Sequence, residues 1–274
     1  MADWQPIKAS KLSSLPTFRL QKVQENIQKE GTESTKPLIR HQTGHEDSND
    51  ILKPDTTLVE KAKELAKDPT LSGYTHSCGM PVPRKAVASA YSLPDCELTD
   101  NDVILFQGND MAINHVMRAF CNENENFLVP SPCDGHWVDS APGYDFVAKT
   151  YKLLPDNDWK VDLKDLESKI DDKTKFIVVA NPSGPTGRVY SKEHLLEIIA
   201  IADKHKIPLV ADETYYNFTF EGNEFIPLAS LAGEIPVVQI SGGTKQYQVP
   251  GWRISWVIFY DRKGYLKNFV AGFQ

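Results

Sequence analysis

Residues 176–187, which read FIVVANPSGPTG, decide the fold class of this chain. Residues 176–180 form an unbroken apolar run rich in β-branched side chains, which is typical of a strand buried on both faces of a parallel sheet. Ser191 follows the turn and can cap a helix. The apolar positions of that helix recur at helical spacing, at Leu195, Ile198, Ile199 and Ala202. The segment therefore predicts a strand, a turn and a covering helix.

Short apolar runs and helical stretches alternate on both sides of this segment. Further strands are predicted at residues 103–106, 127–129, 207–211, 237–240 and 254–260, with Pro130 ending the second of them. Further helices are predicted from Thr56 through Leu58, Ala62, Leu65 and Ala66, and again through Ala112, Val116, Met117 and Phe120. This order predicts an α/β fold of three layers, in which helices cover both faces of a mainly parallel sheet. Ligands of such sheets lie beyond the carboxyl ends of the strands.

The composition is that of an ordinary globular chain of enzyme size. Of the 274 residues, 41% are hydrophobic and 24% are charged, which excludes the disordered and fibrous classes. Lys plus Arg is 30 and Asp plus Glu is 37, so the net charge is −7. Because proteins that bind nucleic acid need a basic surface, we expect no nucleic-acid partner. No uninterrupted apolar stretch approaches eighteen residues, so we expect no membrane partner.

The cysteines indicate the compartment. Cys78, Cys96, Cys121 and Cys133 are widely spaced and include no Cys-x-x-Cys pair, so we expect no metal site. Four cysteines in a chain of this length are typical of reduced thiols rather than of a secreted disulfide framework. The N-terminal residues show no apolar run behind a basic stretch, and we therefore expect no secretory signal and a cytoplasmic location.

Three strand ends contain residue types that can perform chemistry. They read Asn-Pro-Ser-Gly-Pro-Thr-Gly at 181–187, Ala-Asp-Glu-Thr-Tyr at 211–215, and Ser-Gly-Gly-Thr-Lys at 241–245 with Val-Pro-Gly-Trp-Arg at 249–253. Taken singly, the first is an ordinary turn, the Asp of the second an ordinary helix cap, and the Lys of the third an ordinary solvated side chain. Taken together, in this order and at this spacing, the three motifs are specific.

The three motifs resemble those of the pyridoxal-phosphate-dependent aminotransferases of fold type I, and within them the tyrosine aminotransferase group. The resemblance extends from about residue 74 to residue 262. It implies the large domain of that fold, pyridoxal 5'-phosphate as cofactor, and transfer of an amino group between an aromatic L-amino acid and a 2-oxo acid. It also implies that residues 1–50 are an N-terminal arm or part of a small domain. Residues 51–274 are then the cofactor-binding large domain, incomplete at its C-terminal end, and the C-terminal small domain is missing.

The resemblance assigns catalytic roles to three residues. Lys245 matches the lysine that binds the cofactor aldehyde and then moves the proton of the substrate's α-carbon, for which a primary amine on a long flexible stem is suited. Asp212 matches the carboxylate that keeps the cofactor's pyridine nitrogen protonated, so that the ring draws electrons from the substrate. Tyr215 matches the phenol that donates a hydrogen bond to the ring oxygen O3′.

The resemblance also names further cofactor contacts. Arg253 matches the arginine that binds the phosphate with its forked guanidinium. Gly108 and Asn109 lie in the phosphate loop, where backbone N–H groups at a helix start face the anion. Asn181 and Gly184 lie in the Asn-Pro motif, whose second asparagine contacts O3′ in the family.

Tyr74 belongs to a segment that reaches across to another subunit. Together with Gly73 and Gly79, it matches family residues that touch the phosphate in the partner subunit's site. The resemblance therefore implies a homodimer with shared active sites.

Two departures from the family pattern concern the phosphate loop and the ring face. The loop, which in the family reads Ser-Gly-x-Ser or Ser-Gly-Thr, reads Gln-Gly-Asn-Asp at residues 107–110. Asp110 then weakens phosphate binding unless it points away as a helix cap. Asp134 stands where the family has the aromatic that stacks on the ring, although His136 and Trp137 are near enough to replace it if the loop bends.

Two further departures concern O3′ and the lysine. Gly184 replaces the asparagine that contacts O3′, and the loop that ends at Lys245 reads one residue shorter than its family counterpart. Together the departures predict weakened cofactor binding, because a hydrogen bond to a charged group contributes about 1.5–3 kcal/mol.

Three functions stay open at this point. The first is the aminotransferase reaction, with small amino acids and 2-oxo acids as substrates. The second is other lyase or synthase chemistry of the same cofactor on the same fold. The third is a catalytically degenerate relative that acts as a binding protein. The sequence contains neither a Gly-x-x-x-x-Gly-Lys-Ser/Thr loop nor a Gly-x-Ser-x-Gly elbow, which disfavours nucleotide hydrolases and serine hydrolases.

Overall fold

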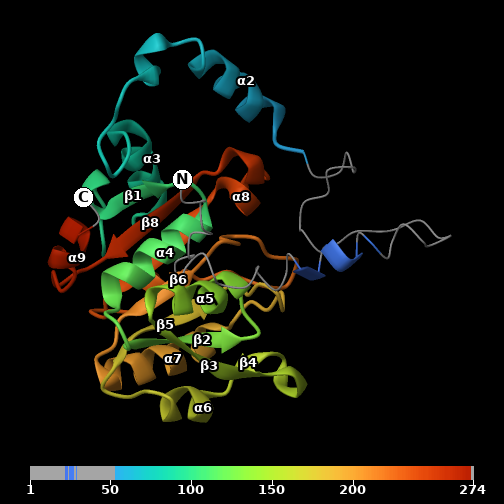
Figure 1. Ribbon diagram of the computed structural model, residues 1–274, viewed down its shortest axis with the longest axis vertical. Helices are drawn as coiled ribbons and strands as arrows, with labels where there is room; N and C mark the ends of the chain where they lie inside the picture. Colours follow the sequence, from blue (N-terminus) through green and yellow to red (C-terminus); the bar gives the residue numbers. More distant parts are fainter. Residues whose placement is uncertain (1–21, 24, 28, 30–52, 273–274) are drawn as a thin grey trace, which may run out of the picture.

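The computed structural model describes residues 22, 23, 25–27, 29 and 53–272. Apart from a few helical positions, the arm predicted for residues 1–50 lies outside the described residues, so that domain boundary stays a prediction. Residues 53–272 form a mixed sheet with helices packed against it (Figure 1).

The described strands form one eight-stranded sheet in the order β1-β8-β7-β6-β5-β2-β3-β4. Their bounds are β1 Val103–Phe106, β2 Asn126–Ser131, β3 Val147–Leu154, β4 Lys160–Val161, β5 Thr174–Ala180, β6 Leu209–Asp212, β7 Val237–Gly242 and β8 Ser255–Tyr260. β8 is antiparallel to both of its neighbours, and β4 is antiparallel to β3. The other pairs are parallel, as predicted.

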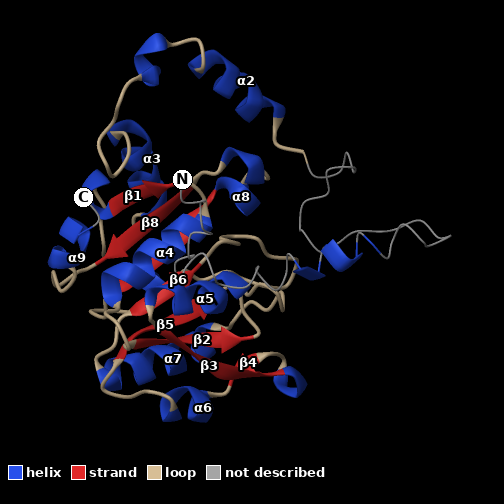
Figure 2. Cartoon of the chain, in the orientation of Figure 1, coloured by secondary structure: helices blue, strands red, loops and turns tan. Residues whose placement is uncertain are grey.

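Eight α-helices are described, and they alternate with the strands (Figure 2). Their bounds are α2 Thr56–Leu65, α3 Pro81–Tyr91, α4 Asn109–Phe120, α5 Gly135–Ser140, α6 Leu163–Ser168, α7 Lys192–His205, α8 Gly243–Gln246 and α9 Lys267–Gly272. Short 3₁₀ turns are η2 Pro69–Ser72, η3 Asp100–Asp102, η4 Ala141–Tyr144, η5 Pro155–Asn157, η6 Leu228–Ser230 and η7 Pro250–Trp252. None of the described helices is long and apolar enough to cross a bilayer.

Two hydrophobic clusters lie on opposite faces of the sheet, so the fold has three layers as predicted. Side chains alternate along β5: Phe176 and Val178 join the cluster under α4 and α5, whereas Ile177 and Val179 join the cluster under α3, α6 and α7. The run of apolar residues in β5 is therefore buried on both faces. This burial explains why the strand reads as unbroken rather than alternating.

The helix that follows β5 begins where the sequence places it. The Ser191 hydroxyl accepts a hydrogen bond from the His194 backbone N–H at 3.4 Å, and the helix α7 starts at the next residue. Its predicted apolar residues, Leu195, Ile198, Ile199 and Ala202, are buried against the sheet.

Pro130 does not end its strand, and that prediction is wrong. β2 continues through Pro130 to Ser131 and stays in register with β3, opposite Tyr151 and Lys152. Register positions with β5 are found at Asn126 and Leu128, nearer the start of β2. Because only β3 pairs with β2 at Pro130, the missing N–H is tolerated there as it is on an edge strand.

The predicted amphipathic helix α2 forms but does not pack as a core helix. None of its residues is buried, and Leu65 is 48% exposed. In Figure 1, α2 stands apart from the layers that enclose the sheet. Leu58, Val59 and Ala62 are half-buried, so its apolar face is only partly covered by the described part of the chain.

Candidate active site

The carboxyl ends of two neighbouring strands bring the predicted acid and lysine to one edge of the sheet. Asp212 is the last residue of β6, and β6 pairs in parallel with β7, opposite Ile240. β7 ends at Gly242 and leads directly into α8, which contains Lys245. Parallel neighbours end at the same edge, so the two side chains emerge side by side, as the motifs predict.

Asp212 is a buried carboxylate that is oriented by two hydrogen bonds. Its Oδ2 accepts from the indole Nε1 of Trp137 at 3.1 Å, and its Oδ1 accepts from the Thr214 hydroxyl at 2.7 Å. Burial raises the pKa of Asp212, and the nearby negative charge of Asp134 raises it further. A cationic group placed against Asp212 would therefore be stabilised strongly, because the carboxylate has no oppositely charged partner among the described residues.

Lys245 is half-buried and its amine lies over an aromatic ring. The Nζ atom is 5.8 Å from the centroid of the Tyr215 ring. Burial lowers the pKa of Lys245, while the negative charge of Asp134 opposes this shift. A lowered pKa increases the fraction of neutral amine, which is the form that attacks carbonyl groups.

Tyr215 packs against Gly184, the residue that replaces the expected asparagine. A Cβ atom at Gly184 would lie 3.0 Å from Cε2 of Tyr215, closer than ordinary side-chain packing allows. A larger residue at position 184 would thus require the ring to move. Burial raises the pKa of the Tyr215 phenol, as do the charges of Asp134 and Asp212.

Gly108 and Arg253 lie next to each other at the same edge of the sheet, where β1 ends and β8 begins. The backbone of Gly108 has φ +87° and ψ 159°, a conformation that residues other than glycine rarely adopt. A Cβ atom there would lie 2.2 Å from Nη2 of Arg253, so the guanidinium lies directly on the loop. The structure therefore brings together two predicted phosphate-binding positions that lie far apart in sequence.

Asp110 does not point away from this loop. Its Oδ2 accepts from Nη2 of Arg253 at 3.1 Å. The alternative in which Asp110 turns away as a helix cap is therefore wrong, because the guanidinium next to Gly108 attracts the carboxylate.

Asn109 connects the loop to the buried acid. Its Nδ2 donates to the Thr214 hydroxyl at 2.6 Å, and that hydroxyl in turn donates to Asp212. Its Oδ1 is buried and has no hydrogen-bond partner among the described residues. Thr214 was missed as a site residue, although its place two residues after Asp212 and its hydroxyl were the available signals.

Asn181 is part of the scaffold beneath the site. Its Oδ1 accepts from the backbone N–H of Tyr190 at 2.9 Å, which closes the loop after β5. Its Nδ2 is buried and has no partner within the described ranges. Its predicted role in cofactor binding stays a prediction, and the structure adds a role in holding the loop.

Trp137 does not replace the stacking aromatic. It is buried in the core, where its ring centroid lies 6.0 Å from that of Phe127, and its indole N–H is directed at Asp212. His136 faces Asn114, with 3.1 Å between Nε2 and Oδ1. Asp134 caps α5 by accepting from the His136 backbone N–H, so the loop does not bend as that hypothesis required.

Tyr74 lies outside this constellation. It is fully exposed in the segment between η2 and α3, so it does not pack against the site residues described above. The prediction that it serves the site of a partner subunit is not tested by a single chain.

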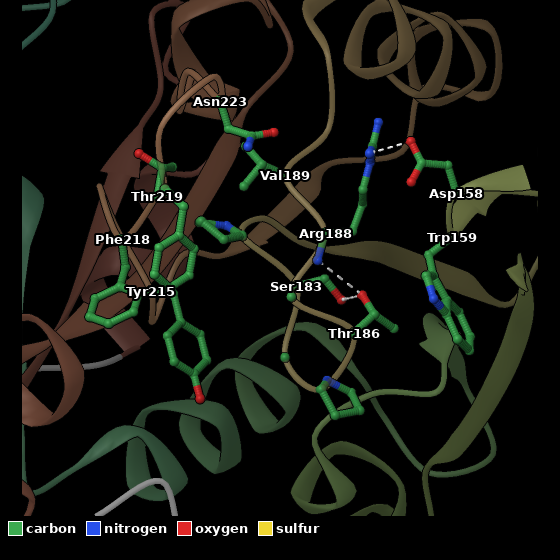
Figure 3. Close-up of a pocket in the computed structure, with 15 residues that line it drawn as sticks. Asp158, Trp159, Ser183, Thr186, Arg188, Val189, Tyr215, Phe218, Thr219 and Asn223 are labelled. Atoms are coloured by element: carbon green, nitrogen blue, oxygen red, sulfur yellow. Dashed lines mark hydrogen bonds and ion pairs between the residues drawn. The ribbon is translucent and has the colours of Figure 1, made fainter.

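A cavity of about 450 Å³ adjoins the site beside Tyr215 and Gly184. Figure 3 shows Tyr215 and Phe218 on one side of it and Trp159 on the other. Arg188, at its rim, forms an ion pair with Asp158. Within the described residues, no group of three or more His, Cys, Asp or Glu side chains is placed to hold a metal ion.

This sheet and the residues at its edge define the large domain of a fold type I transferase. The chain belongs to the family "Aminotransferase class I and II", whose sequence model matches residues 46–270. It is 41% identical over 212 residues to a tyrosine aminotransferase of Dictyostelium discoideum, covering 75% of this chain and 49% of that protein. It is 37% identical over 217 residues to a tyrosine aminotransferase of Bos taurus, covering 79% and 48%.

Solved structures of aminotransferases have the same fold. A tyrosine aminotransferase from Leishmania infantum superimposes with a TM-score of 0.90 at 26% identity, covering 99% of this chain and 67% of that one. An alanine aminotransferase from Pyrococcus furiosus gives 0.85 at 28% identity, covering 97% and 67%. The chain spans about half the length of the curated relatives it matches.

Proposed function

We propose that the protein transfers an amino group between an L-amino acid, aromatic ones included, and a 2-oxo acid, with pyridoxal 5'-phosphate as its cofactor. Members of the family generally depend on this cofactor. The observation that supports the proposal most is the convergence of Asp212, Lys245 and Tyr215 at the carboxyl ends of β6 and β7. A buried acid, an amine of lowered pKa and a phenol are the groups that this chemistry needs.

The residues present fit this cofactor at its ring end, and at its phosphate end they offer a guanidinium that Asp110 partly neutralises. At the ring end, Asp212 has no cationic partner within the described residues, and Lys245 presents an amine over the Tyr215 ring at the same edge of the sheet. At the phosphate end, Arg253 lies on the Gly108 loop, and the buried Oδ1 of Asn109 has no partner in the described part of the chain. Lys245 would bind the aldehyde, Asp212 the pyridine nitrogen, and Arg253 the phosphate.

When bound, the cofactor supplies a carbonyl that condenses with amines and a ring that withdraws electrons from the α-carbon. Asp212 holds a proton on the ring nitrogen, because Trp137 and Thr214 fix its carboxylate in place. Lys245, whose amine is neutral more often than that of an exposed lysine, would accept the proton from the α-carbon and deliver it to C4′ of the cofactor. Tyr215 donates a hydrogen bond from its phenol, whose raised pKa keeps the proton on oxygen.

We further propose a homodimer in which Tyr74 contributes to the site of the partner subunit. Its full exposure next to the projecting α2 supports this proposal. Sedimentation of the wild-type protein and of Tyr74→Ala tests whether the homodimer forms and whether Tyr74 contributes to it. A cytoplasmic location also remains a proposal, and cell fractionation tests it.

The central experiment follows the bond between Lys245 and the cofactor. Adding pyridoxal phosphate should produce a visible absorption band, and borohydride reduction should leave a permanent mass increase on the peptide that contains Lys245. Lys245→Ala should abolish both signals, whereas Lys85→Ala, on an exposed lysine of α3, should keep them. If wild-type protein shows neither signal, the proposed function is wrong.

Turnover separates the proposal from its alternatives. Tyrosine added to the loaded protein should yield its 2-oxo acid together with the aminated cofactor, and 2-oxoglutarate should reverse the change. Elimination products would instead support lyase chemistry. Cofactor binding without either reaction would support a degenerate binding protein, which the replacements at Asp134 and Gly184 favour.

A further inference from the structure

The guanidinium of Arg253 is already paired with a carboxylate of the same chain. Nη2 of Arg253 donates to Oδ2 of Asp110 at 3.1 Å, and the two side chains are 47% and 56% exposed. The pair joins the residue after η7 to the first turn of α4, far apart in sequence. The positive charge of Arg253 at the phosphate end is therefore neutralised in part by a carboxylate of the same chain.

The loop geometry fixes where this pair lies. The guanidinium rests on Gly108, so close that a Cβ atom there would be 2.2 Å from Nη2. Asp110 lies in the first turn of α4, where the helix dipole favours a negative charge. An anion that approaches Arg253 at this loop thus arrives next to the carboxylate of Asp110.

We propose that Asp110 determines the charge of the group accepted at Arg253, so that the site disfavours a phosphate dianion relative to a neutral or singly charged substituent. This inference rests on the proposed function, because it concerns the phosphate end of the same cofactor. Like charges a few ångström apart near a protein surface repel strongly enough to weaken binding by about ten-fold or more. This repulsion weakens the binding of the phosphorylated cofactor. It does not affect pyridoxal, which has a hydroxymethyl group in place of the phosphate.

The test removes the charge while preserving the shape. Asp110→Asn keeps the side-chain volume, and Asp110→Ser restores the hydroxyl that the family has there. Asp95→Asn is the matched control, because it removes the acid of another ion pair, with Arg262, and changes the net charge equally. Thermal unfolding of each variant verifies that the fold is intact.

Pyridoxal phosphate and pyridoxal are titrated separately, with binding followed by tryptophan fluorescence. We expect both Asp110 variants to bind pyridoxal phosphate about ten- to a hundred-fold more tightly than wild type. Their affinity for pyridoxal should change by less than about threefold, and Asp95→Asn should change neither. Unchanged or weakened binding of pyridoxal phosphate to both Asp110 variants would overturn the proposal.

Inorganic phosphate keeps this test separate from the proposed function. If borohydride traps no cofactor on Lys245 in any variant, the proposed function has failed, and calorimetric titration with inorganic phosphate then decides the role of Asp110. Tighter phosphate binding by Asp110→Asn than by Asp95→Asn would support the proposal, and equal binding would refute it.

Discussion

Glu213 should make the stability of the protein fall as the pH rises. The side chain follows Asp212 but points to the opposite face of the sheet, and it is 1% exposed. Its Oε1 accepts from the Leu228 backbone N–H at 2.8 Å, while its Oε2 has no hydrogen-bond partner among residues 53–272. Burial raises the pKa of Glu213 from 4.5 to about 8, the Leu228 bond lowers it, and the charge of Asp212 raises it.

The magnitude follows from the difference between the folded and unfolded pKa. Below pH 4.5 the carboxyl is protonated in both states and costs nothing. Between pH 4.5 and about pH 8 the unfolded chain ionises while the folded chain retains its proton, so the unfolded state becomes relatively more stable. At about 1.4 kcal/mol per pH unit, the loss reaches about 3–5 kcal/mol by pH 9.

Urea unfolding from pH 5 to pH 9, followed by tryptophan fluorescence, measures this loss. In Glu213→Gln the neutral amide keeps the acceptor for Leu228, so the variant should become more stable relative to wild type as the pH rises. Glu221→Gln, at an exposed position, is the matched control and should follow the wild-type profile. A constant difference between wild type and Glu213→Gln across this range would refute the reasoning.

Three further predictions concern the loop, the core and the thiols. Gly108→Ala should lower the free energy of unfolding by about 1–3 kcal/mol, because its φ of +87° strains other residues; an unchanged urea midpoint would contradict this. Ile198→Ala should cost about 2–5 kcal/mol, since the side chain is fully buried, and a loss below 1 kcal/mol would count against that packing. Cys121 and Cys133, whose pKa burial raises to about 12, should react with iodoacetamide at pH 8 far more slowly than in urea. Peptide mass spectrometry checks this, and equal rates would refute it.

Much of the sheet could be predicted because its central strands are buried on both faces. β5 and the first three residues of β6 read as continuous apolar runs, β7 is mostly apolar apart from Gln239 and Ser241, and burial is what such runs require. β3 could not be singled out, because most of its side chains are partly exposed and lysines interrupt it. The sequence also did not predict which strands pair with β8, since pairing between strands distant in sequence leaves no local pattern.

In the candidate site, too, local motifs could be predicted from the sequence and contacts between distant residues could not. The position of Lys245, Asp212 and Tyr215 at one edge of the sheet could be predicted, because their motifs follow predicted strands and resemble those of a known family. The bond from Trp137 to Asp212 joins residues 75 positions apart, and it depends on how α5 approaches β6. The pair of Asp110 and Arg253 spans 143 positions. Its charges were visible in the sequence, but their distance was not.

The insertion of β8 between β1 and β7 has a consequence for the newly made chain. Among the described strands β1 pairs with β8 alone, and β8 follows all the other described strands in the chain, so it is synthesised after them. The parallel strands β2, β3, β5, β6 and β7 can associate first. Until β8 is made, β1 has no strand to pair with and its apolar side chains stay exposed. Since Gly108 follows β1 and Arg253 precedes β8, the half of the site at this loop is assembled after the half at the end of β6.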